Sequence, residues 1–165
     1  MKKGLLMSLL CNLVLSLPAL GQTEMPDRSK PTGFRDEVFG LGFFAGPVGG
    51  LGVSFRHHLK VPFSYQVTAG IIKADKRLLY DVGAEAQYDI SRSERGRFFV
   101  GGGLGYFYSG ESNGNDLKGP FRVGLGGGGE LGISPVLTGI LEVQFTYFSD
   151  GNIIPLPQVG VFYYF

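Results

Sequence analysis

Cysteine is almost absent from this chain, because Cys11 is the only one, and it lies within a strongly apolar N-terminal stretch. Charge is scarce as well. Charged residues make up 18% of the chain, below the usual quarter, and the net charge is +1 with no cluster of Lys and Arg. The sequence therefore offers little for disulfide or thiol chemistry and no basic surface for nucleic acid.

A helical pattern is also missing. Beyond residue 37, no window keeps apolar residues at positions i, i+3, i+4 and i+7 without an interrupting Gly or Pro. Glycine is abundant instead, with 28 residues, and aromatic residues reach 13%. Since no Gly-X-Y repeat is present, collagen is excluded and a β-rich fold is favoured. A chain of 165 residues has room for one such domain.

The N-terminus has the three parts of a secretory signal peptide. Lys2 and Lys3 precede an apolar run over residues 5–17, and the Ala-Leu-Gly sequence at 19–21 provides a small-x-small cleavage site. We therefore predict a signal peptide over residues 1–21, cleaved near Gly21. Its removal leaves 13 of the 15 basic residues against 14 acidic ones. The polar, proline-containing residues 22–37 are predicted to form a flexible lead-in to a barrel domain at 38–165.

In the barrel domain the hydrophobic pattern repeats every second residue, as in β-strands. Over residues 78–90 the even positions are all apolar, and the odd positions are nearly all polar or small. The same separation recurs at 121–133 and 137–147, and the connections are rich in Gly, Pro, Asn, Asp and Ser, as in hairpins. The predicted strands are 38–46, 50–58, 63–72, 78–90, 98–108, 121–133, 137–147 and 158–165.

The polarity of the two faces separates a membrane barrel from a soluble one. The polar face of residues 121–133 is mostly glycine with Arg122 and Glu130, which would make a poor solvent-facing surface. Strands of about ten residues are long enough to cross a bilayer when tilted. We therefore predict an all-β, eight-stranded antiparallel up-and-down transmembrane β-barrel with its apolar face toward lipid. The alternative, a soluble periplasmic lipid-binding barrel, requires the apolar face to point inward.

Aromatic residues on the apolar face fall into two bands when both termini are taken as periplasmic. Such bands are typical of the two membrane interfaces, with aliphatic residues between them. The tyrosines predicted to form these girdles are Tyr65, Tyr88 and Tyr163 on the periplasmic side and Tyr80, Tyr106, Tyr108 and Tyr147 on the outer side. The same topology puts the longest connection, at 109–120, on the outside.

The alternating strands and the C-terminal positions Val159, Val161, Tyr163 and Phe165 resemble the small eight-stranded outer-membrane barrels of the OmpA-transmembrane-domain and OmpX type. The resemblance implies a bacterial (Gram-negative) outer-membrane location and a C-terminal signal read by the barrel-assembly machinery. Two prolines near the start of the last strand depart from a regular ladder. Because proline has no N–H to donate, this part of the strand is predicted to be frayed.

Charged residues on the polar face are predicted to form a network inside the lumen. An eight-stranded barrel is just wide enough for its side chains to fill, so these charges must largely satisfy one another. The predicted network consists of Arg56, Asp81, Glu85, Arg122, Glu130 and Glu142. It favours a closed plug of ion pairs over the alternative of a gated ion or proton path.

Three other patterns are weighed and set aside. Ser54, His57 and His58 could suggest a lipid-modifying acyl transferase, but the two histidines have opposite parity at the periplasmic end. The glycine-rich runs have no helix after them to hold a phosphate. The oxygen-rich residues Glu111, Asn113, Asn115 and Asp116 lack the spacing of a calcium loop. No catalytic, cofactor or metal site is predicted.

The sequence thus predicts a non-enzymatic integral outer-membrane protein with a structural or general envelope role. Its lumen is closed and it is not an open pore. The expected partners are outer-membrane lipids and the barrel-assembly machinery, and the protein is expected to be a monomer. The alternatives are an outer-membrane lipid-modifying barrel enzyme and the soluble lipid-binding barrel.

Overall fold

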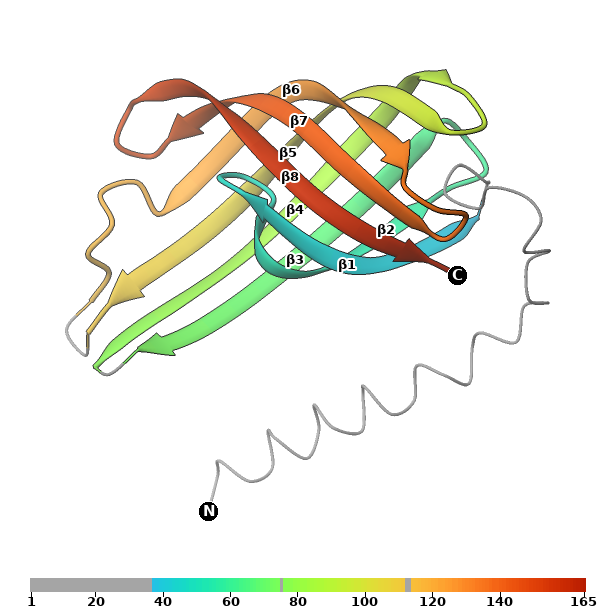
Figure 1. The fold of residues 1–165 in the computed structure, drawn as a ribbon. Coiled ribbons are helices and arrows are strands. Elements are labelled where there is room, and N and C mark those ends of the chain that lie inside the picture. Colours follow the sequence, from blue (N-terminus) through green and yellow to red (C-terminus); the bar gives the residue numbers. More distant parts are fainter. Residues whose placement is uncertain (1–36, 75, 112–113) are drawn as a thin grey trace.

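The computed structural model describes residues 37–74, 76–111 and 114–165, so the predicted signal peptide and residues 22–36 of the lead-in lie outside the described residues. All of its regular structure is β (Figure 1). The strands are β1 (Val38–Gly46), β2 (Gly50–His58), β3 (Phe63–Ala74), β4 (Arg77–Arg92), β5 (Gly96–Gly110), β6 (Phe121–Gly132), β7 (Leu137–Phe148) and β8 (Ile153–Tyr164). No helix in this part of the chain is long and apolar enough to cross a membrane.

Each strand pairs antiparallel with the next along the chain, and β1 pairs with β8, which closes the sheet. The predicted eight-stranded antiparallel up-and-down barrel is therefore confirmed. The bounds of β1 and β2 are those predicted, whereas β3 to β5 are longer than predicted at one or both ends. We call the end with the C-terminus the terminal end, and the end with the connections 47–49, 75–76, 111–120 and 149–152 the loop end (Figure 1).

The apolar side of each strand faces outward, and the polar side faces the lumen. Leu125 is 70% exposed and Val82 is 49% exposed, while Glu85 on the opposite parity of β4 is 3% exposed. Since the side chains of a strand alternate between two faces, one such assignment fixes the orientation of the whole strand. The soluble lipid-binding alternative required the reverse orientation, so it is wrong.

The wall of the barrel has unequal height. On the loop side, pairing of β1 with β8 stops at Ala45 and Val159, and pairing of β2 with β3 stops at Val53 and Ala69. Beyond these points β3 pairs only with β4, and β8 pairs only with β7. The β3–β4 hairpin therefore extends past the short β1–β2 hairpin (Figure 1).

The prediction of a frayed start for the last strand is wrong. β8 begins at Ile153, and Pro155 and Pro157 pair in register with Phe145 and Val143 of β7. Residues two apart direct their N–H groups to the same neighbour. Because the β7 ladder continues, the missing donors of both prolines fall on the β1 side, where β8 has no partner before Val159.

Candidate functional site: the barrel lumen

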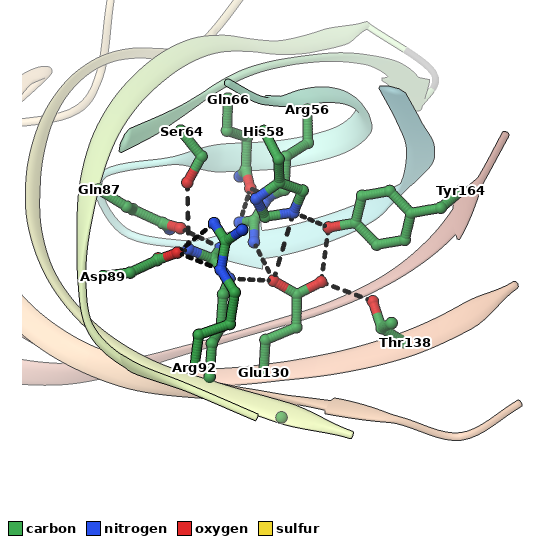
Figure 2. Close-up of polar contacts among 12 residues, drawn as sticks. Arg56, His58, Ser64, Gln66, Gln87, Asp89, Arg92, Glu130, Thr138 and Tyr164 are labelled. Carbon is green, nitrogen blue, oxygen red and sulfur yellow. Dashed lines mark hydrogen bonds and ion pairs between the residues drawn. The ribbon is translucent and has the colours of Figure 1, made fainter. Parts of the chain in front are cut away.

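A buried carboxylate organises the terminal end of the lumen. Glu130 of β6 is fully buried, and Figure 2 shows it between arginine side chains and two hydroxyl donors. Its Oε2 lies 3.1 Å from Arg56 Nη1 and 2.8 Å from Arg97 Nε. Its Oε1 accepts hydrogen bonds from Thr138 Oγ1 at 2.7 Å and Tyr164 OH at 2.5 Å. With His58, whose Nε2 lies 2.7 Å from Tyr164 OH, these residues form the Glu130 cluster.

Arg97 of β5 joins this cluster to β3 and β4. Its guanidinium makes an ion pair with Asp89 and donates to Ser64 Oγ at 3.1 Å and Gln87 Oε1 at 2.8 Å. The same group lies over the ring of Phe99, 4.7 Å from its centroid. Each nitrogen of this buried guanidinium thus has an acceptor, and one of its faces lies on an aromatic ring, which offsets the burial of the charge.

Arg56 of β2 is held in a similar way from the other side. It donates to Gln66 Oε1 and lies over the ring of Phe162, 4.5 Å from the centroid. Together, Arg56 and Arg97 supply two positive charges against the carboxylates of Glu130 and Asp89. Arg92, at the edge of the lumen, adds a further ion pair to Asp89 at 2.5 Å. Each carboxylate at the terminal end of the lumen is therefore paired with two arginines.

A second polar group, the Glu85–Glu142 pair, has no such balance. Gln158 Nε2 donates to Glu85 Oε1 and Glu142 Oε1 at 2.7 Å each, and Gln144 and Gln87 supply longer bonds of 3.2 and 3.5 Å. Among the described residues, neither carboxylate makes an ion pair. Glu85 Oε2 and Gln144 Oε1 are buried without a hydrogen-bond partner. Neutral amides alone therefore support two buried acids.

The connection between β1 and β2 enters the lumen on the loop side of this pair. Within residues 47–49, here called the inward turn, Val48 is fully buried, and the N–H groups of Val48 and Gly49 donate to Gln158 Oε1 at 3.0 Å each. Glycines on the opposite wall make room for it. A Cβ at Gly83 would lie only 2.3 Å from the backbone carbon of Gly49. The wall glycines whose Cβ would meet the inward turn are Gly83, Gly103, Gly105 and Gly124.

Asp81 and Arg122 hold the inward turn at its loop side. Asp81 Oδ1 accepts a 2.6 Å bond from Leu51 N, directly after the turn. Arg122 Nη1 donates to the carbonyl of Pro47 at 3.3 Å, and its guanidinium lies 3.8 Å from the centroid of the Phe107 ring. Both side chains are only partly buried. They act on the turn and do not contact the Glu130 cluster.

The six residues predicted as one network thus lie in three groups. Arg56 and Glu130 make an ion pair at the terminal end. Glu85 and Glu142 share Gln158 in the middle, and Asp81 and Arg122 bind the inward turn at the loop end. What the sequence does not reveal is that the charges are segregated by depth, with both well-compensated carboxylates at one end.

Several lumen residues were missed. Arg97 was left out because the predicted strand began at Phe98, two residues after the observed start of β5. Asp89 lay on the predicted polar face but was not included, and His58 was considered for acyl transfer and not for the network, although both are buried. Tyr164 could have been found from parity, since it lies between the outward-facing Tyr163 and Phe165 and is fully buried.

The predicted girdle tyrosines project from the outer wall. Those near the terminal end belong to β3, β4 and β8, and those near the loop end belong to β4, β5 and β7. At the loop end Tyr80 stacks on Tyr108 with ring centroids 4.8 Å apart, and Tyr108 OH donates to the carbonyl of Gly114 at 3.0 Å. The exposed members are Tyr65, Tyr80, Tyr88, Tyr106, Tyr147 and Tyr163, and Tyr108 is half-buried.

The residues considered for acyl transfer do not assemble. Ser54 Oγ accepts a 2.8 Å bond from Thr68 inside the lumen. His57 faces outward, with Nδ1 3.2 Å from Tyr65 OH, while His58 faces inward in the Glu130 cluster. Adjacent residues of one strand point to opposite faces, so these two imidazoles cannot serve one reaction centre.

The oxygen-rich connection between β5 and β6 uses its polar groups internally. Asn115 Oδ1 accepts from Ser109 N and Leu117 N at 3.1 Å each, and Asp116 makes an ion pair with Arg77 at 3.3 Å. Asn113, part of the same pattern, lies outside the described residues. Over the ranges that the structure describes, no three His, Cys, Asp or Glu side chains group as a metal site.

No family model matches this chain, and no curated protein sequence matches it. A solved structure of the Yersinia pestis outer membrane protein Ail, in a phospholipid bilayer nanodisc, is similar in its backbone. The two chains are 13% identical, with a TM-score of 0.45, and the match covers 79% of this chain and 100% of Ail. This similarity is too low to carry a functional argument, which therefore rests on the residues of this chain.

Proposed function

We propose that this protein is an integral β-barrel of a Gram-negative-type outer membrane, with a structural or general envelope role and a closed lumen. The outward orientation of the apolar residues carries the proposal. Phe43 is 71% exposed, Leu125 is 70% exposed and Phe98 is 67% exposed, and they lie on three different strands. Soluble monomers rarely expose contiguous apolar surface beyond a few hundred Å².

The polar groups support the same environment. Inside a bilayer, every backbone group must be paired within the protein, and a closed barrel meets this requirement. The buried ionic groups face the lumen, where ion pairs and amides replace water. The two bands of outward tyrosines fit the positions of the two interfaces, which supports a membrane belt between the terminal end and the loop end.

The closed lumen is proposed from two obstructions in series. The Glu130 cluster crosses the barrel between β2, β5, β6, β7 and β8, and the inward turn occupies the space beside β4, β5 and β6. A path for ions would have to displace both. The protein is accordingly proposed to contribute surface and stability to the envelope, not permeability.

The membrane location is tested by fractionation followed by electrophoresis with and without boiling. We expect the protein in the outer-membrane fraction, with a mobility that changes on boiling because the barrel withstands detergent until heated. Recovery in the soluble periplasmic fraction, with unchanged mobility, would contradict the proposal. The closed lumen is tested separately in planar bilayers, where a steady single-channel current would contradict closure and leave the location intact.

The C-terminal positions Val159, Val161, Tyr163 and Phe165 are proposed to be read by the barrel-assembly machinery. All four side chains project outward from the end of the closing strand. We expect Phe165→Ser to lower the amount of heat-modifiable protein in the membrane. The control is Phe145→Ser, which removes an equally outward aromatic ring from β7. An equal loss in both variants would point to general hydrophobicity and not to a terminal signal.

A lipid-modifying enzyme remains the second candidate. The proposed role is non-enzymatic because the residues considered for catalysis do not meet: His57 lies on the outer face of the wall, whereas Ser54 and His58 are buried in the lumen with other hydrogen-bond partners. Mass spectrometry of lipids from cells with and without the protein distinguishes the two, since an enzyme would change acyl-chain number or headgroup.

A further inference from the structure

The outer wall has an apolar cleft at the terminal end. It has a volume of about 450 Å³ and lies across β5, β6 and β7, below the turn that joins β4 to β5. We call it the Gly129 groove, after the residue at its floor. Its lining includes Ser91, Arg95, Phe98, Gly129 and Leu141.

The absence of a side chain on Gly129 creates the groove. Gly129 occupies an outward position on β6, where its neighbours in register are Phe98 of β5 and Leu141 of β7. A Cβ at Gly129 would meet the Phe98 ring at 3.4 and 3.5 Å and the Arg97 carbonyl oxygen at 3.6 Å, which are ordinary van der Waals contacts, so no close backbone approach accounts for the glycine. Phe98 is 67% exposed and Leu141 is 59% exposed. The result is a groove that has no side chain at its floor and apolar side chains along its sides.

The mouth of the groove is polar and positively charged. The β4–β5 turn is fixed above it, since Arg95 O accepts from Gly132 N at 2.9 Å and Ser93 Oγ exchanges hydrogen bonds with the backbone of Gly96. Arg95 is exposed and makes no ion pair among the described residues. The other guanidiniums nearby, of Arg92 and Arg97, both bind Asp89. Arg95 is thus the cation directed to this site.

We propose that the Gly129 groove is a binding site for a phospholipid with a net negative headgroup, in the leaflet at the terminal end. One acyl chain lies over Gly129 between Phe98 and Leu141. The phosphate is bound by the Arg95 guanidinium, with the exposed Ser91 as a further donor. This inference rests on the proposed membrane location and adds a chemical preference to it.

Charge distinguishes this groove from two clefts near the loop end of the outer wall. The larger cleft, of about 670 Å³, lies over β2, β3 and β4 and is lined by apolar residues such as Phe43, Val53 and Ile71. Its only charged lining residue is Asp81, which would repel an anionic headgroup. Glu94, the acidic residue of the β4–β5 turn, does not line the Gly129 groove. A third cleft, of about 250 Å³ at the loop end, includes Arg122, but Asp81 lines it as well, so its two charges offset each other. Among these three clefts, the Gly129 groove therefore fits an anionic lipid best.

The preference is tested with the full mature protein purified in detergent and mixed with phosphatidylglycerol or phosphatidylcholine of identical acyl chains. Native mass spectrometry then counts the lipids retained. Wild type is expected to retain more phosphatidylglycerol than phosphatidylcholine. In Arg95→Gln, the ratio of the two retained lipids is expected to fall about fivefold, which is the contribution of one arginine near a membrane surface. The control is Arg77→Gln, which removes an exposed arginine at the loop end.

The apolar part of the site is tested by filling the groove. Gly129→Leu is expected to lower retention of both lipids. The control is Gly139→Leu, because Gly139 also faces outward and its Cβ would likewise meet nothing closer than 3.4 Å. Equal effects of the two substitutions would overturn the site.

Equal retention of both lipids by wild type would also overturn the proposal, as would equal effects of Arg95→Gln and Arg77→Gln. These outcomes are separate from failure of the proposed function, because they would be obtained with protein that still enters the membrane and still changes mobility on boiling. If Arg95→Gln did not fold, the loss of the wild-type preference in high salt would serve as the second measurement.

Discussion

The Glu130 cluster and the Glu85–Glu142 pair share one lumen but solve the burial of carboxylates differently. Around Glu130, two arginines, a tyrosine and a threonine bind both oxygens of one acid. Around the pair, three glutamine amides bind two acids, and one carboxylate oxygen has no partner. The first arrangement pairs its carboxylate with cations, whereas the second places two acids without ion pairs beside the inward turn.

The comparison is tested most strongly by Arg97→Met. The substitution removes the one guanidinium that pairs with both Glu130 and Asp89, leaving Arg56 to the first and the partly exposed Arg92 to the second. We therefore expect the free energy of unfolding to fall by about 3 kcal/mol. Urea titration, with the folded fraction read from unboiled gels, measures it. Arg95→Met is the control, since the exposed Arg95 is outside the cluster and should change stability by less than about 0.5 kcal/mol. Similar losses would mean that Glu130 is not specially compensated.

Gly83→Ala tests whether the inward turn is seated as tightly as the contacts indicate. The new methyl group would lie 2.3 Å from the backbone of Gly49, so the turn or β4 must move. We expect a loss of about 1–3 kcal/mol by overpacking, measured by the same titration. Gly139→Ala should be nearly neutral, because its methyl group would contact only the Ile133 side chain, at 3.4 Å or more. A neutral Gly83→Ala would show a turn that leaves the lumen easily.

Glu142→Gln and Glu130→Gln should have effects of opposite sign. Glu142→Gln replaces one of two neighbouring buried acids, neither of which makes an ion pair among the described residues, by a neutral amide, so stability should rise by about 1 kcal/mol. Glu130→Gln removes the only anion between Arg56 and Arg97 and should be strongly destabilising. Paired urea titrations provide the comparison. Destabilisation by both would show that the Glu85–Glu142 pair is compensated after all.

The smallest loss of stability is expected for Arg77→Gln, which removes an exposed ion pair and so provides a reference for the losses caused by substitutions of buried groups. Arg77 and Asp116 form an ion pair at 3.3 Å with side chains 60% and 55% exposed. Solvent screening should limit the loss of stability to about 0.3 kcal/mol. A loss comparable to that of Arg97→Met would remove the distinction between buried and exposed pairs on which the comparison depends.

The fold could be predicted because a period of two is a local property. Residues 78–90 show their two faces without reference to any other strand, and the structure extends that segment only to Arg77 and Arg92. The prolines of β8 were misjudged for the opposite reason. Their effect depends on which side of the strand has a neighbour, and this follows from the early end of β1, more than 100 residues away in the chain.

The lumen could be predicted only in composition. Parity selected inward residues such as Glu85 and Arg122, but grouping them requires the strand order around the barrel and the depth of each residue. The inward turn is the clearest case. Its sequence, Pro-Val-Gly, reads as an ordinary hairpin connection, and its position depends on Gln158 of β8 and on glycines of β4 to β6.

The contact of Gln158 with the inward turn links two events in the formation of the molecule. Gln158 directly precedes Val159, the residue at which β8 begins to pair with β1. The seam that turns an open sheet into a cylinder therefore lies beside the amide that captures Val48 and Gly49. Before β1 pairs with β8, the Gln158 amide is not in place to bind Val48 and Gly49. The pairing of the first and last strands therefore also fixes the turn that closes the lumen.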